Sequence, residues 1–324
     1  MTWNPDAENE SLRWSWERHE AEELDSYMIA DVEDPRIHCQ SILTRALVAD
    51  TLWPGEFTDL IDAEQRFGIV MTWILQQFKS GTPPADLYDK VVERDCPGFV
   101  AETHYWLPQQ RIVRDYVTLS LQNHEAQLPD IALQTFTDLW REALAERSVE
   151  QPLRLLEAAC GSANDYRFLE AFGFAPFLNY TGFDISPKNI DNARRRFPEA
   201  DFFVGSAFDT GLPDGAYDFV FTHDLFEHLS PDGLEAAFGE LLRVTGRQAW
   251  LHFFNLSTSA AEHEIVPVDH YHWNLLSLKQ LERSIPPEFG APEVIPIPEF
   301  LNDQFGCADY YNKEAVTLLV TRGG

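Results

Sequence analysis

Two stretches in the second half of the sequence bring histidines and carboxylates together, and such side chains can exchange protons near neutral pH. The first is THDLFEHL, residues 222–229, and the second runs from His263 to His272. A histidine there could take the proton of a phenol or another hydroxyl group, with hydrogen bonding inside the fold or substrate packing as the alternatives. The candidate catalytic histidines are His223, His228, His270 and His272, and the neighbouring carboxylates are Glu227, Glu264 and Asp269.

A metal ion is the alternative use of these side chains. The suitable donors are His223, Asp224, His252, Asn255, His270 and His272. Their spacing fits no compact ligand motif, and His223 and His228, five positions apart, would not share one face of a helix. The four cysteines form no CxxC pair, which argues against a zinc knuckle. We therefore expect no metal and reduced thiols.

A turn of small residues indicates a second kind of chemistry. The stretch LRLLEAACGSAN, residues 153–164, reads as an apolar strand ending in Glu157, a turn around Gly161, and a helix. Such a turn directs backbone N–H groups and the positive end of the helix dipole toward a ligand, although an ordinary strand-to-helix turn is the alternative. Asp184 follows Glu157 by 27 positions, which is compatible with an acid that binds ribose hydroxyls. Its alternative is a turn aspartate before the helix cap Ser186.

The chain that positions these residues divides near residue 150. Before it, apolar residues recur at helical spacing between Pro and Gly breakers, and we expect a helical domain over residues 1–150. Seven of the nine tryptophans lie there, in a core, a dimer interface or a pocket, with Trp14, Trp16 and the segment 104–106 as candidates for the pocket. The expected helices are Leu12–Ile29, Ser41–Leu52, Leu60–Phe78, Ala85–Arg94, Gln109–Leu121 and Ile131–Arg147.

From residue 151 to 324 short apolar runs alternate with amphipathic stretches, which predicts an α/β fold with a doubly wound sheet. Ser186-Pro187 and Ser230-Pro231 predict helix starts, and Ser277 with Gln280 predicts a capping box. Pro296 places the sixth strand at a sheet edge, with a long non-helical stretch after it. The expected strands are Leu153–Ala159, Tyr180–Ile185, Asp201–Val204, Tyr217–His223, Gln248–Phe254, Val294–Ile297 and Ala315–Thr321.

The composition excludes some partners. The formal net charge of -29 opposes binding to nucleic acid, because each phosphate contact needs a nearby cation. No apolar run approaches the roughly 20 residues of a membrane span, and the N-terminus is acidic where a signal peptide would be basic. We expect a soluble cytoplasmic protein.

Four motifs in order make residues 153–321 resemble a class I S-adenosylmethionine-dependent methyltransferase. They are LLEAACGSA after the first strand, YTGFDIS at the second, FFVGSAFD at the third and GAYDFVFTHDLFEHL at the fourth. The resemblance implies six parallel strands with an antiparallel seventh beside the edge strand. It also implies S-adenosylmethionine as the cofactor.

The resemblance assigns cofactor contacts residue by residue. It puts Glu157 near the methionine ammonium, Ala159 and Gly161 against the cofactor, and Asp184, with Ile185 beside it, on the ribose hydroxyls. Further contacts are expected from Ser206 and Ala207 around the adenine, and from Asp224 and Leu225 facing the sulfonium.

Two departures from the family pattern bear on these contacts. Ala159 and Ala163 stand where many members have glycine, so we expect them to limit positive φ in the turn. Ser206 stands where members often have an aspartate for the adenine amino group. Asp209 is either its substitute or a turn residue before Gly211.

The implied activity is methyl transfer to oxygen or nitrogen of a small-molecule acceptor. Most of the acceleration comes from proximity, with a histidine base if the acceptor must lose a proton. The N-terminal helices would cover the acceptor site or build a homodimer. A non-catalytic scaffold or cofactor-binding protein with this fold is the alternative, and the acids Glu157 and Asp184 speak against it.

Overall fold

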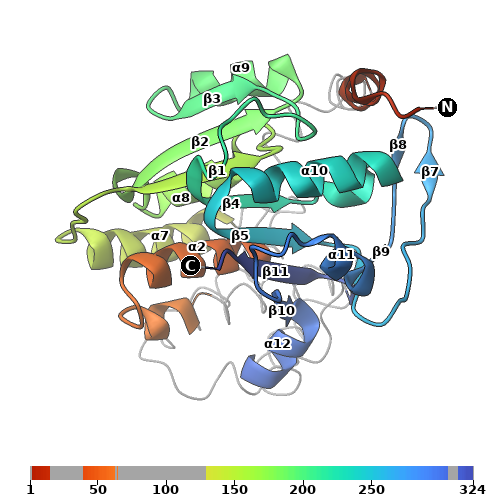
Figure 1. The fold of residues 1–324 in the computed structure, drawn as a ribbon. Coiled ribbons are helices and arrows are strands. Elements are labelled where there is room, and N and C mark those ends of the chain that lie inside the picture. Colours follow the sequence, from red (N-terminus) through yellow and green to blue (C-terminus); the bar gives the residue numbers. More distant parts are fainter. Residues whose placement is uncertain (1, 15–38, 63, 65–128, 306–312, 324) are drawn as a thin grey trace, which may run out of the picture.

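A seven-stranded sheet forms the centre of the computed structural model, which describes residues 2–14, 39–62, 64, 129–305 and 313–323 (Figure 1). The strand order is β10-β11-β5-β4-β1-β2-β3, and β11 runs antiparallel to both of its neighbours. This is the predicted α/β fold with an antiparallel last strand. The strands are β1 Leu153–Ala158, β2 Leu178–Asp184, β3 Asp201–Val204, β4 Tyr217–His223, β5 Thr245–Phe253, β10 Glu293–Pro296 and β11 Val316–Thr321.

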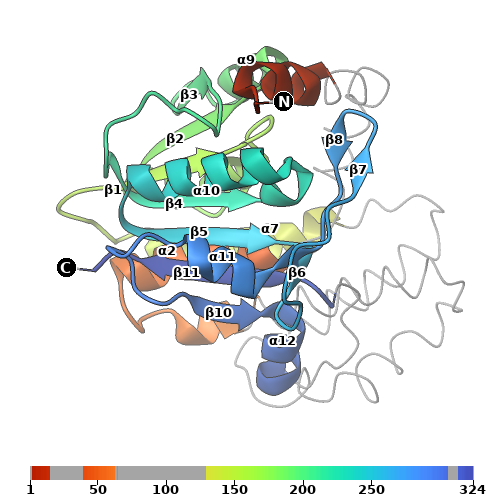
Figure 2. The same ribbon diagram turned by 45° about the vertical axis from the view of Figure 1, so that its right-hand side comes forward.

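Helices cover both faces of the sheet (Figure 2). One hydrophobic cluster joins one face to α2, α7, α8 and α9, and a second joins the other face to α10 and α11. The helices are α2 Cys39–Leu52, α7 Pro129–Leu144, α8 Asn164–Ala171, α9 Pro187–Arg196, α10 Pro231–Val244, α11 Leu278–Ser284 and α12 Ile297–Phe305, with 3-10 turns η2 Ala175–Phe177 and η3 Phe226–His228. Residues 5–14 form a further helix.

Four short strands extend beyond the carboxyl end of β5. They are β6 Leu256–Ser257, β7 Pro267–Val268, β8 Tyr271–His272 and β9 Leu276–Ser277. β7 and β8 pair antiparallel, and Figure 2 shows this pair, called here the β7–β8 arm, beside the helix of residues 5–14. The arm therefore lies at the end of the sheet where a ligand of a parallel sheet is expected.

Helix caps fix where the chain leaves each strand. Ser186 accepts a hydrogen bond from the N–H of Asn189 at 3.4 Å, and Ser230 accepts one from Gly233 at 3.1 Å, as predicted. Ser277 likewise caps α11 by accepting from the N–H of Gln280. A capping box also requires the Gln280 side chain to accept from the N–H of Ser277. This part of the prediction is wrong, because the Gln280 side chain accepts from the N–H of His263 instead.

The stretch after the sixth strand differs from the prediction. It was expected to be non-helical, whereas α12 begins at Ile297 directly after β10. Pro298 lies in the first turn of this helix, where its missing N–H has no intrahelical partner to lose. Pro296 ends β10, which is an edge strand as predicted.

The N-terminal helices that can be compared agree with the prediction except at their ends. α2 contains the expected helix Ser41–Leu52, α7 ends at Leu144 instead of the expected Arg147, and both share a core with β1 through residues such as Trp140. The helix of residues 5–14 begins before the expected Leu12. The division of the chain at residue 150 stays a prediction. The expected helices Ala85–Arg94 and Gln109–Leu121, most of Leu12–Ile29 and Leu60–Phe78, Trp16 and the segment 104–106 lie outside the described residues.

None of the described helices combines the length and the apolar character needed to cross a membrane.

Candidate functional site

The turn after β1 passes through three left-handed residues at alternate positions. The φ angles are 57° at Ala159, 54° at Gly161 and 67° at Ala163. The expectation that the two alanines would limit positive φ is therefore wrong, and each holds this conformation at a cost of about 1–2 kcal/mol. No described atom lies within 4 Å of a Cβ built on Gly161. The turn thus keeps a glycine-like shape with open space in front of it, which fits a ligand held against backbone.

Asp184, at the end of β2, ties this turn to the next strand. One carboxylate oxygen, Oδ2, accepts from the N–H of Gly161 at 3.0 Å. The other, Oδ1, accepts from the N–H of Ser186 at 2.8 Å and from the amide of Asn189 at 3.2 Å. Burial raises the pKa of Asp184, and these hydrogen bonds oppose that rise. The side chain is both the predicted strand-end acid and a turn aspartate.

Glu157, the next-to-last residue of β1, has its carboxyl group turned toward Tyr180, whose hydroxyl donates to it at 2.5 Å. The residue is 2% exposed. Burial raises the pKa of Glu157 well above its ordinary value, and the charge of Asp165 raises it further. The neighbouring Cys160 is a buried free thiol. Glu157 is therefore buried next to the turn after β1.

The residues predicted beside the ribose acid and around the adenine lie at the ends of β2 and β3. Ile185 follows Asp184 and is partly buried, as are Ser206 and Ala207. Asp209 is exposed and accepts from the N–H of Gly211 at 3.2 Å, which is the turn alternative. Ser206 and Asp209 form an isolated backbone bridge, and the Asp209 carboxylate serves the turn of its own loop.

His223, at the carboxyl end of β4, pairs with Asp165 in the first turn of α8. The distance between His223 Nδ1 and Asp165 Oδ2 is 2.9 Å, and the side chains are 15% and 19% exposed. The imidazole stacks on His252 with ring centroids 4.2 Å apart and planes 7° apart. A histidine oriented by a carboxylate is an arrangement that can accept a proton.

The surroundings of His252 keep its imidazole uncharged. It lies in β5, is fully buried, and its ring nitrogens contact the hydroxyls of Thr44 at 2.9 Å and Thr317 at 2.8 Å. Burial lowers the pKa of His252 well below its ordinary value, and the charge of His223 lowers it further. His252 thus gives His223 a flat, neutral neighbour.

Two carboxyl groups follow His223 in the loop after β4. Asp224 is exposed and has φ 51°, a left-handed conformation rare outside glycine. Leu225 is partly buried beside it. Glu227 is fully buried, and its Oε1 accepts from the N–H groups of Phe254 and Asn255 while Oε2 has no hydrogen-bond partner among the described residues. Glu227 thereby joins the loops that follow β4 and β5.

The other predicted histidines gather away from His223, at the β7–β8 arm. His228 Nδ1 contacts the carbonyl of His272 at 3.1 Å, and its ring packs against Tyr271 and Trp273. His270 is exposed, and its ring lies 4.2 Å from that of Trp14. Burial lowers the pKa of His228 and of His272. The structure thus brings His228 and His272 together and places His223 with other partners.

In the described ranges, no three His, Cys, Asp or Glu side chains are grouped as a metal site would require.

Three residues of the site escaped the sequence analysis. Asp165 is the partner of His223, and its one signal was an acid in the first turn of a helix. Asn9 and Arg13 reach the ends of β3 and β2 from the N-terminal helix, contacting Ser206 and the carbonyl of Ile185. Nothing in local spacing could reveal contacts across almost 200 positions.

The family comparison agrees with this geometry. Residues 155–248 match the family model described as a methyltransferase domain. The match begins in β1 and ends in β5, and so includes the turn, Asp184 and His223. The chain contains a class I S-adenosylmethionine-dependent methyltransferase domain. The seven-stranded sheet with its antiparallel last strand is the architecture that the sequence resemblance implied.

Among known proteins, the methyltransferase domain is similar to demethylmenaquinone methyltransferase of Thermotoga maritima, at 32% identity over 82 residues. That stretch is 25% of this chain and 35% of the relative, so the chain matches about a third of the relative's length.

Solved structures resemble the chain at lower identity. A Pyrococcus horikoshii protein is 18% identical, with 60% of this chain and 92% of that chain covered and a TM-score of 0.39. The Burkholderia thailandensis 1,6-didemethyltoxoflavin-N1-methyltransferase, solved with 1,6-didemethyltoxoflavin and S-adenosylhomocysteine, is 12% identical, covering 67% of this chain and 90% of that chain with a TM-score of 0.39.

The left-handed alanine in the turn gives a stability prediction. Ala159→Gly should raise the free energy of unfolding by about 0.5–1 kcal/mol, because relief of left-handed strain outweighs the added freedom of the unfolded chain. The matched control is Ala158→Gly, the same change in β1 at ordinary φ, which should lower it by about 1 kcal/mol or more. Urea unfolding measures both, and equal losses would contradict the strained turn.

The buried carboxyl of Glu227 gives a pH prediction. Burial raises its pKa to about 8, so between roughly pH 5 and 8 the folded protein holds a proton that the unfolded chain has released. The free energy of unfolding should therefore fall as the pH rises through this window. Glu227→Gln should reduce that fall by at least about 1.4 kcal/mol, the value of one pKa unit.

Urea titrations at pH 5 and pH 8 measure this effect. The control is Glu235→Gln, at an exposed position of α10. Identical pH dependence in both variants and the wild type would show that Glu227 does not titrate in this window.

Proposed function

We propose that the protein transfers a methyl group from S-adenosylmethionine to an oxygen or nitrogen of a small-molecule acceptor. The observation that carries this proposal is the pair of His223 and Asp165 at the carboxyl end of β4. Asp165 belongs to the helix that begins directly after the left-handed turn. A proton acceptor therefore stands beside the part of the domain that the family uses for its cofactor.

The residues around the turn fit the cofactor. The open space before Gly161 admits a ligand against backbone, and the Asp184 carboxylate, with three of about four acceptor positions occupied, retains one for a ribose hydroxyl. Ile185 and Ala207 offer partly buried apolar surface beside it. When bound, S-adenosylmethionine supplies an electrophilic methyl group on a sulfonium.

The work left to the protein is positioning and deprotonation. In this proposal the Asp165 carboxylate, 2.9 Å from Nδ1 of His223, holds the imidazole that takes a proton from the acceptor. The Asp165 carboxylate stabilises the imidazolium that forms, and the neutral His252 stacked beneath adds no opposing charge. A base of this kind suits a phenol, another hydroxyl or a protonated amine.

Two further features support a small acceptor. The net charge of -29 opposes a nucleic-acid substrate. The N-terminal helix and the β7–β8 arm lie at the same end of the sheet as His223, where they would cover a compact acceptor (Figure 2). In this proposal the N-terminal region closes the acceptor site.

The test combines cofactor binding with transfer of radiolabelled methyl groups to extracted small molecules and to a panel of phenols and amines. The wild type should label an acceptor, and His223→Gln should lower the rate by about 10²–10⁴, the usual contribution of a general base. S-Adenosylhomocysteine should bind this variant as tightly as the wild type. Unchanged transfer would remove His223 as the base, and cofactor binding without any labelled product would contradict the proposed function.

A pair of variants on α8 separates a positioning role from a structural one. Asp165→Asn should lower the rate and move its pH dependence toward lower pH, because the carboxylate that favours protonated His223 is gone. The control, Glu170→Gln, changes an exposed acid of the same helix and should alter neither. A slower Asp165→Asn enzyme with an unmoved pH profile would contradict the pairing.

A further inference from the structure

The helix of residues 5–14 is separated from the other N-terminal helices and lies over the ends of β2 and β3. Figures 1 and 2 show it beside α9 and the β7–β8 arm, whereas α2 and α7 lie across the other end of the sheet order. It precedes the residues that the family model matches. Its contacts therefore come from outside the matched residues.

Glu8 docks this helix onto the start of α10. Its carboxylate accepts from the N–H of Ser230 at 2.8 Å and from the Ser230 hydroxyl at 2.6 Å. A Cβ built on Gly233 would lie 2.6 Å from the Glu8 carboxylate, so a larger residue there would force this carboxylate to move. Leu12, one turn later, is buried in the same hydrophobic cluster as α10. Charge and apolar packing thus fix one face of the helix.

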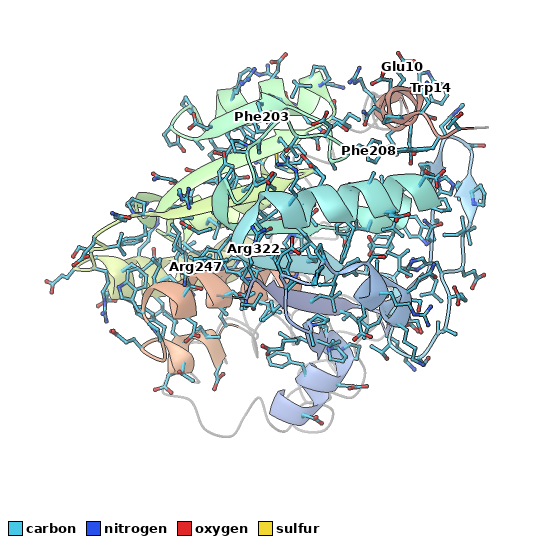
Figure 3. The ribbon with its side chains drawn as sticks, in the orientation of Figure 1. Glu10, Trp14, Phe203, Phe208, Arg247 and Arg322 are labelled. Carbon is cyan, nitrogen blue, oxygen red and sulfur yellow. The ribbon has the colours of Figure 1, made fainter. Side chains whose placement is uncertain are left out.

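Both ends of the helix are also held. The indole of Trp3 packs edge-to-face on Phe208 with centroids 5.4 Å apart. Ser11 donates to the carbonyl of His270 at 3.0 Å, and the ring of Trp14 contacts that histidine. Figure 3 shows Trp14 on this helix and Phe208 between the helix and α10.

The adjacent face of the helix points toward the carboxyl ends of β2 and β3. Asn9 and Arg13 are one turn apart and so share that face. Asn9 Oδ1 accepts from the hydroxyl of Ser206 at 2.9 Å, and Arg13 Nε donates to the carbonyl of Ile185 at 3.1 Å. Ser206 follows β3, and Ile185 follows the strand-end acid of β2.

If S-adenosylmethionine binds as proposed, the strand order directs its base toward these two contacts. The turn after β1 lies on one side of β2, and β3 lies on the other. A nucleoside with its ribose at Asp184 therefore extends its base along the carboxyl ends toward β3 and Ser206. In the loop after β3, Ser206 supplies a hydroxyl, and one oxygen of the exposed Asp209 accepts from the N–H of Gly211. A carboxamide, by contrast, offers one donor and one acceptor group, which matches an edge of adenine.

We propose that Asn9 recognises the amino edge of adenine and that the docked N-terminal helix thereby completes the cofactor site. The inference rests on the proposed function for the identity of the cofactor. Arg13 positions the helix against β2, and Glu8 positions it against α10. Specificity for adenine then comes from a residue outside the methyltransferase domain.

The test is a calorimetric titration of the full chain with two ligands. They are S-adenosylhomocysteine and the analogue in which hydrogen replaces the 6-amino group of its adenine. Asn9→Ala should weaken binding of S-adenosylhomocysteine about tenfold, the value of one good hydrogen bond, and weaken binding of the analogue by less, because the analogue keeps only the ring nitrogen as a partner. Asn9→Asp, which keeps an acceptor for the amino group, should restore the preference for S-adenosylhomocysteine. Equal weakening for both ligands would overturn the recognition role of Asn9.

Two further variants isolate docking. Gly233→Ala should displace Glu8 and weaken S-adenosylhomocysteine binding about as much as Asn9→Ala, with little added loss in the double variant. Alanine is favoured inside a helix, so α10 itself should not lose stability. Glu10→Ala, at an exposed position of the same helix (Figure 3), should change neither affinity.

Unchanged binding in Gly233→Ala would overturn the claim that the docked helix completes the site. A wild-type chain that binds neither ligand would instead refute the proposed function, which keeps the two failures distinguishable.

Discussion

The carboxylate of Asp184 is the interaction on which the arrangement of the cofactor end depends. Its two oxygens accept from Gly161 in the turn after β1 and from Ser186 and Asn189 at the start of α9. The turns that follow the neighbouring strands β1 and β2 are thereby joined by hydrogen bonds. Asn189 also contacts Ser162 through its side chain, and Arg196 donates to the Ser162 carbonyl, so α9 holds the turn at further points. A buried carboxylate costs desolvation, which these donors offset.

Strain gathers at the same end of the sheet. Three of the four described non-glycine residues with positive φ are Ala159, Ala163 and Asp224, at the carboxyl ends of β1 and β4. Each is kept in an unfavourable conformation by the elements packed around it, and such conformations concentrate at functional sites. Next to them lie the buried carboxyl groups of Glu157 and Glu227, whose pKa values burial raises. The fold tolerates strain and desolvation where the methyltransferase domain is expected to do chemistry.

Local sequence was sufficient for the scaffold and for single positions in it. Alternating apolar runs and serine caps predicted the seven strands and the starts of α9 and α10, because both signals act over a few residues. The same local reasoning failed at Ala159 and Ala163, where packing overrides the preference of alanine. It failed again after Pro296, where proline can begin a helix as well as end a strand.

Partnerships across the fold could not be predicted in this way. Four histidines were indistinguishable by type and spacing, and only the sheet order separates His223 beside Asp165 from His228 beside His272. Asn9 and Arg13 illustrate the same limit, because their partners are far from them in the sequence. The sequence does not show which of several histidines lies beside a given carboxylate in the folded chain.

The most direct measurement of the central claim is calorimetric titration of S-adenosylhomocysteine into the wild type and into Asp184→Asn, with circular dichroism to verify that both are folded. A cofactor site organised by Asp184 should bind one ligand per chain, and the variant should lose about 1.5–3 kcal/mol of binding free energy, the scale of a charge-assisted hydrogen bond. Equal affinity in the two folded proteins would contradict the account.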